Sequence, residues 1–78
     1  MSISDFDQLI VVDSRIMAGK PVIAGTRITV EYVLEQLRHG HTIDELLEGH
    51  PRLTREGVMA AIDFALDAVR GERVLAAS

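Results

Sequence analysis

The spacing of apolar residues changes at Thr29, and this change constrains the fold more than any other feature of the chain. Before Thr29, short apolar runs are separated by turn-forming pairs such as Gly19-Lys20 and Gly25-Thr26, a pattern typical of short strands. After Thr29, apolar residues recur three and four positions apart, which is typical of amphipathic helices. The sequence therefore predicts an α+β fold, with short N-terminal antiparallel strands followed by a three-helix bundle.

Four apolar runs predict the strands of the small sheet. They lie at residues 9–12, residues 15–17, residues 22–23 and Ile28. Pro21 has no amide hydrogen for a strand ladder, so the strand beside it is expected to start there or to lie at an edge. An open edge near Pro21 would be a place for a second chain to pair.

Threonine residues mark the starts of the three predicted helices. A threonine is a favoured N-cap residue, and the spacing of Thr42 and Glu45 is that of a capping box. The predicted N-caps are Thr29, Thr42 and Thr54. Glycines mark the predicted helix ends, since glycine readily adopts the conformation that terminates a helix. These glycines are Gly40, Gly49 and Gly71.

The length and composition of the chain predict one domain. Residues 1–29 form the β region, residues 30–71 the three helices and residues 72–78 a C-terminal tail. A domain of 78 residues buries only about 60–65% of its unfolded surface. The chain has no cysteine, which favours a reducing compartment. No targeting segment or long apolar stretch is apparent, so a cytoplasmic location without membrane attachment is expected.

Three short helices joined by tight turns indicate a helix-turn-helix arrangement, in which the first turn of the last helix reads bases. The candidate DNA-binding residues there are Arg52, Thr54, Arg55 and Met59. The net charge of −4 opposes strong nonspecific binding to nucleic acid. Any compact three-helix bundle would show the same periodicity, so a purely structural interpretation stays open.

The turn around Gly25 is the second candidate surface. Its residues, with Lys20, form either a structural turn or a partner contact: Lys20, Gly25, Thr26 and Arg27. Gly25 suits a turn with positive φ, and the Thr26 hydroxyl suits a local bond to the backbone. The Arg27 guanidinium is expected either to clamp backbone carbonyls or the Glu31 carboxylate, or to reach a partner.

No constellation of residues predicts catalysis, a metal or a cofactor. His39, His41 and His50 lack the spacing of a metal site, and two of them, His39 and His50, lie near predicted helix C-termini. No nucleophile-base pair or phosphate-binding glycine loop is present. The sequence therefore predicts a protein that is not an enzyme.

The stretch "GKPVIAGTRITVEYVLEQLRHGHTIDELLEGHPRLTREGVMAAIDFAL" resembles the family named domain of unknown function 433. The matching motif residues are Gly19, Lys20 and Pro21, then Gly25, Thr26 and Arg27, then Thr42 and Glu45, and finally Pro51, Leu53 and Thr54. Two positions depart from the family pattern. Ala24 replaces a common basic residue, and Gly57 replaces a common acidic one, which is expected to weaken the start of the last helix.

The resemblance implies an antitoxin with a fold similar to helix-turn-helix proteins, often encoded beside a PIN-like ribonuclease toxin. The expected function is to neutralise that toxin by covering its acidic, metal-binding site, and to bind operator DNA in its own promoter. Two alternatives stay open: a DNA-binding transcriptional regulator without a toxin, and a non-catalytic module that only dimerises. A homodimer is expected, paired through the sheet edge near Pro21.

Overall fold

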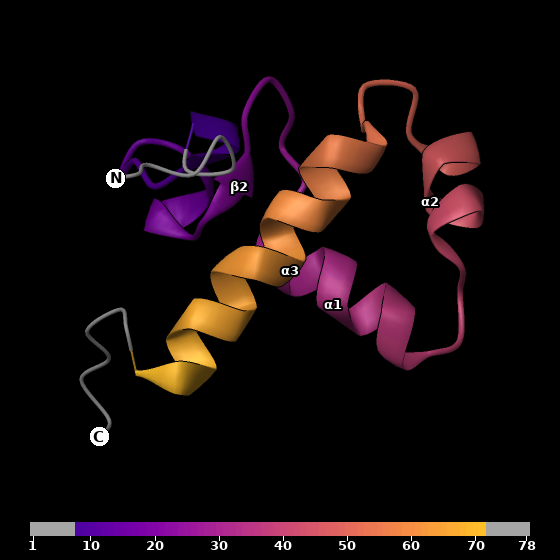
Figure 1. The fold of residues 1–78 in the computed structure, drawn as a ribbon. Coiled ribbons are helices and arrows are strands. Elements are labelled where there is room, and N and C mark those ends of the chain that lie inside the picture. Colours follow the sequence, from indigo (N-terminus) through magenta and orange to yellow (C-terminus); the bar gives the residue numbers. More distant parts are fainter. Residues whose placement is uncertain (1–7, 72–78) are drawn as a thin grey trace.

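The computed structural model describes residues 8–71, in which a short sheet packs beside three helices (Figure 1). The elements follow the chain as β1 (Ile10–Val11), the 3-10 turn η2 (Met17–Gly19), β2 (Val22–Ile23), α1 (Val30–Arg38), α2 (Ile43–Gly49) and α3 (Arg55–Arg70). This arrangement confirms the predicted α+β fold. The predicted C-terminal tail lies outside the described residues.

β2 begins at Val22, directly after Pro21, as predicted, but backbone covers the side of β2 away from β1, so the expectation of an open edge there is wrong. On one side β2 pairs antiparallel with β1, with Ile10 opposite Ile23. On the other side the Ile23 amide donates to the Ile28 carbonyl at 2.9 Å, and Val22 bridges Thr29. The predicted strand at Ile28 is therefore reduced to this short bridge. It closes the sheet edge at which dimerisation was expected.

The predicted strand at residues 15–17 is also wrong, because Asp13 forms a local turn there. The Asp13 carboxylate accepts from the Arg15 amide at 2.8 Å and from its guanidinium at 3.0 Å and 3.2 Å. These bonds hold the pKa of Asp13 below its ordinary value. Met17, Ala18 and Gly19 then have φ values of 50°, 59° and 84°. A left-handed run of this kind cannot continue a strand.

All three predicted N-caps are confirmed. The hydroxyl oxygens of Thr29, Thr42 and Thr54 each accept from the amide three residues ahead, at 2.9 Å, 3.1 Å and 3.0 Å. The Thr42 amide also donates to the Glu45 carboxylate at 2.9 Å, which completes the capping box. The glycine ends are confirmed as well, since Gly40 and Gly71 have positive φ and α2 ends at Gly49.

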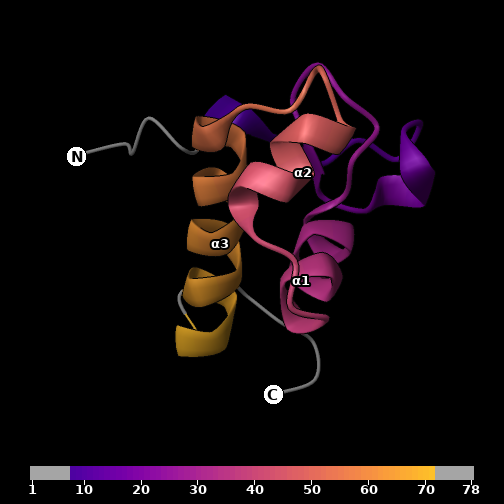
Figure 2. The ribbon, with the colours of Figure 1, turned by 90° about the vertical axis from the view of Figure 1, so that its right-hand side faces the viewer.

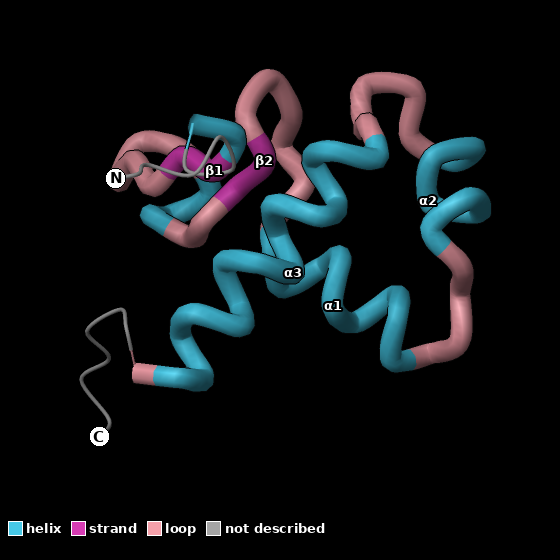
Figure 3. Tube along the Cα trace, in the orientation of Figure 1, coloured by secondary structure: helices cyan, strands magenta, loops and turns pink. Residues whose placement is uncertain are grey.

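α3 is the element against which the other parts pack. It contacts both strands and both other helices, and in Figures 1 and 3 it runs diagonally across the view and passes in front of α1. In Figure 2, turned by 90°, α3 and α1 lie in two neighbouring layers. The buried core, to which β2, all three helices and the turn before α3 contribute, is aliphatic: Ile23, Val30, Val33, Leu46, Leu53, Val58 and Ala61.

Gly57 is buried where α3 meets β2. A Cβ atom at this position would lie 2.9 Å from Cγ2 of Ile23 and 3.6 Å from Cδ1 of Leu53. The glycine that looks in the sequence like a weak helix start is therefore required by the close approach of α3 to the sheet.

Among residues 8–71, no helix combines the length and apolar character needed to cross a membrane.

Candidate partner-binding surface

The Gly25-Thr26-Arg27 turn is held in one conformation by short bonds. Gly25 has a φ of 78°, which glycine adopts without strain. The Thr26 hydroxyl donates to the Ile23 carbonyl at 2.7 Å and accepts from the Ile28 amide at 2.9 Å. The predicted bond from this hydroxyl to the backbone is confirmed. The turn is thus rigid, and it presents the next side chain, Arg27, to solvent.

Arg52 joins this turn from a distant part of the sequence. Its Nη1 atom donates to the Gly25 carbonyl at 3.4 Å. Arg27 and Arg52 thereby line one surface pocket of about 520 Å³, together with Ile16, Gly25 and Thr26. We call this the arginine pocket. It unites residues that the sequence assigns to two separate candidate surfaces.

Arg27 does not form the internal clamp that was one of its two expected roles. Its guanidinium has no hydrogen bond or ion pair with any of residues 8–71. The Glu31 carboxylate instead accepts from Lys20 Nζ at 3.1 Å. The backbone explains the exchange, because the Val30 amide donates to the Pro21 carbonyl at 2.9 Å and so brings Lys20 beside Glu31. Arg27 is left facing the pocket.

The candidate DNA-binding residues at the start of α3 are exposed, but three of them have contacts within the chain. Arg52 donates to Gly25. The Thr54 hydroxyl caps α3 through the Gly57 amide. Arg55 forms an ion pair with Asp44 of α2, with both side chains more than half exposed. Met59, 41% exposed, lies one turn further along α3.

A contact between Tyr32 and His50 was not anticipated from the sequence. The Tyr32 hydroxyl and His50 Nε2 are 3.1 Å apart, and their rings meet edge to face with centroids separated by 5.4 Å. His50 also caps the C-terminus of α2, as His39 caps that of α1. The pair lies beside the arginine pocket, because Arg27, Tyr32 and His50 share a second, smaller hollow with Met17.

Acidic residues occupy the exposed face of α2. They are Asp44, Glu45 and Glu48. The Thr42 amide, with a smaller effect from His41 3.4 Å away, holds the pKa of Glu45 below its ordinary value. No group of three acids, histidines or cysteines within the described part of the chain is arranged to hold a metal ion.

Residues 10–65 match the family described as "Protein of unknown function (DUF433)". A curated relative, "Uncharacterized protein y4eO" of Sinorhizobium fredii (strain NBRC 101917 / NGR234), is 36% identical over 59 residues. The match covers 74% of this chain and 27% of the relative, so the chain spans about a quarter of that protein. No solved structure matches the chain.

Proposed function

Because the chain belongs to the DUF433 family of proteins of unknown function, its activity has to be inferred from its own surface, and we propose that it is the antitoxin of a toxin–antitoxin pair. In this proposal it binds a PIN-like ribonuclease directly and blocks the acidic, metal-binding site of that enzyme. The same protein, alone or in the complex, also binds the promoter of its own operon.

The observation that carries the proposal is the position of Arg27. Its side chain is exposed, has no hydrogen bond or ion pair within residues 8–71, and lines the arginine pocket together with Arg52. A guanidinium binds carboxylates through two parallel hydrogen bonds. An acidic nuclease site would offer such carboxylates once its metal ions leave. Arg27 would then take the place of those ions.

The rigidity of the turn supports this role for Arg27. The Thr26 hydroxyl bonds and the Arg52 contact fix the backbone before any partner arrives. A preorganised contact loses less conformational entropy on binding than a mobile one. The binding surface therefore needs little rearrangement to meet the enzyme.

The acidic face of α2 supports the same orientation. α2 ends at Gly49, just before the turn that carries Arg52. A ribonuclease surrounds its acidic centre with basic residues that hold the RNA backbone. The carboxylates of Asp44, Glu45 and Glu48 would face such a basic rim while the arginines enter the centre.

Exposure of Arg55 favours the second candidate function, a stand-alone regulator that binds DNA. Arg55 lies in the first turn of α3, where a helix-turn-helix protein contacts bases. Its ion pair with Asp44 has to be exchanged for a base or phosphate, which lowers the affinity of one chain for DNA. Because breaking this ion pair weakens DNA binding by a single chain, we favour DNA binding as an additional property of the toxin complex. A function that consists of DNA binding alone is the less favoured alternative.

A ribonuclease inhibition assay tests the proposal. The PIN-like protein encoded beside this gene is mixed with wild type, with Arg27→Ala, or with Arg70→Ala as a control for loss of an exposed arginine at the far end of α3. We expect Arg27→Ala to raise the apparent Kd about 10- to 100-fold, the effect of losing about 1.5–3 kcal/mol from a charge-assisted bond. Equal inhibition by Arg27→Ala and wild type would exclude the assigned role of Arg27.

A further inference from the structure

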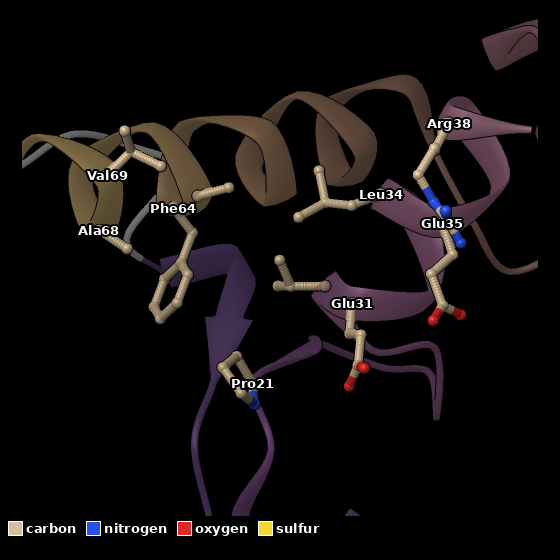
Figure 4. Close-up of a pocket in the computed structure, with 10 residues that line it drawn as sticks. Pro21, Glu31, Leu34, Glu35, Arg38, Phe64, Ala68 and Val69 are labelled. Carbon is tan, nitrogen blue, oxygen red and sulfur yellow. The ribbon is translucent and has the colours of Figure 1, made fainter. Parts of the chain in front are cut away.

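An apolar groove runs between α1 and the C-terminal half of α3 (Figure 4). Its volume is about 550 Å³, and Pro21 closes one end. Its lining combines larger side chains with the small side chains of Ala65 and Ala68, which allow another helix to approach closely. In Figure 4, Leu34 of α1 and Phe64 of α3 lie on opposite sides of the groove.

Apolar side chains on this surface stay in contact with water. Leu34 is 36% exposed and Val69 is 83% exposed. Both side chains line one continuous groove, and a partner seated in it would remove them from water. The groove shares no lining residue with the arginine pocket, so its occupant need not be the partner of Arg27.

The charges along α1 indicate what fits the groove. Glu31, Leu34, Glu35 and Arg38 are all exposed, and their spacing of three, one and three residues puts them on one face of the helix. If a second α1 packs antiparallel about an axis between positions 34 and 35, Arg38 lies opposite Glu31 of the second copy, whose Oε1 atom already accepts from Lys20 of its own chain, so Arg38 would bond the remaining carboxylate oxygen. The reverse pair forms at the other end, so the face is complementary to itself.

We propose that the groove is the homodimerisation surface and that its occupant is α1 of a second copy of this chain. The two α1 helices cross antiparallel at Leu34, each Leu34 side chain resting on the Ala65 and Ala68 floor of the other copy. The contact is isologous, as a two-fold axis requires. It replaces the sheet edge, which residues 28–30 already cover. The groove and the arginine pocket have no lining residue in common, so the proposed contact does not use the residues assigned to the ribonuclease.

Cross-linking tests this arrangement in the free protein, without a ribonuclease. The chain has no cysteine, so one cysteine introduced into each of two variants reports one contact between the copies. On mild oxidation, a mixture of Leu34→Cys and Ala68→Cys is expected to give a disulfide-linked dimer at least tenfold faster than a mixture of Leu34→Cys and Leu66→Cys, because a disulfide forms only between cysteines whose Cα atoms lie within about 7 Å. Leu66 is a matched control because it is 42% exposed and does not line the groove. Equal rates for the two mixtures would overturn the proposal.

Mass measurement by light scattering gives an independent result. Wild type and Leu66→Glu are expected to be dimers at tens of micromolar. For Leu34→Glu and Arg38→Glu, the dissociation constant of the dimer is expected to rise at least fivefold. Circular dichroism melts verify that each variant is folded. A wild-type monomer up to several hundred micromolar would overturn the assignment. A dimer unaffected by Leu34→Glu would overturn it as well, since a different surface would then join the copies. If the wild type is monomeric and Leu34→Glu instead weakens ribonuclease binding, the groove belongs to the toxin.

Discussion

Gly57 and Ile23 approach so closely that a Cβ atom on Gly57 would lie 2.9 Å from Cγ2 of Ile23. Helix propensity alone predicts that Gly57→Ala stabilises α3 by about 1 kcal/mol. We expect the reverse, a loss of about 1–3 kcal/mol, because the added methyl group must displace β2 or its buried side chains. Chemical denaturation of the two proteins measures the difference.

Gly49→Ala is the matched control for this substitution. Gly49 is also helical, but its added Cβ would meet nothing within 4 Å. The free energy of unfolding should therefore stay the same or rise by about 0.5 kcal/mol. A stabilised Gly57→Ala variant would show that α3 does not need this close contact with the sheet.

The capping box of α2 predicts a dependence of stability on pH. The Thr42 amide lowers the pKa of Glu45 in the folded chain. A carboxyl group with a lowered folded pKa contributes its full stabilisation above its unfolded pKa and loses it as the pH falls through the folded pKa. We expect Glu45→Gln to melt below wild type at pH 7 and to approach wild type below about pH 4.5, the ordinary glutamate value. Melting curves at pH 7, 4 and 3 that stay equally far apart would contradict this role.

The helix starts were predictable because capping is local. Thr29, Thr42 and Thr54 each bond an amide three residues away, so the residues that decide the outcome are adjacent in the sequence. A local interaction also explains why the strand predicted at residues 15–17 does not form. Their apolar character favours a strand, but the side chain of Asp13 binds the Arg15 backbone and turns the chain first.

The candidate site was harder to predict because it depends on distant contacts. Arg52 and Gly25 are 27 positions apart, and no spacing rule connects them. Glu31 was a reasonable local partner for Arg27 by sequence distance alone. The bond between Val30 and Pro21 gives Lys20 that position instead. Long-range packing therefore decides which arginine is free.

Arg27→Ala is expected to leave folding stability unchanged. The guanidinium is exposed and has no bond within residues 8–71, and surface substitutions of this kind change stability by less than about 0.5 kcal/mol. Thermal melts of the free protein check this. A loss of about 1 kcal/mol or more would indicate that Arg27 has an internal role and would remove the main support for a partner contact.

Asp44→Asn tests DNA binding by α3. Removing the carboxylate releases Arg55 from its ion pair and takes away one repulsive charge, so the free protein, without the toxin, should bind its promoter more tightly. Arg55→Ala should relax sequence preference, and Arg52→Ala should weaken binding to all sequences and reduce the salt slope by about one unit. Gel-shift titrations at two salt concentrations measure these effects. Full operator affinity in the Arg52→Ala, Arg55→Ala double variant would show that this end of α3 does not contact DNA.

Titration of the neighbouring PIN-like ribonuclease with this protein, followed by RNA cleavage, tests the central claim most directly. The account predicts that wild type abolishes cleavage at about one chain per enzyme, and that Arg70→Ala does the same. It predicts that Arg27→Ala, still folded, needs about 10- to 100-fold more protein for the same inhibition. Unchanged RNA cleavage in the presence of equimolar or excess wild type would contradict the assignment as an antitoxin.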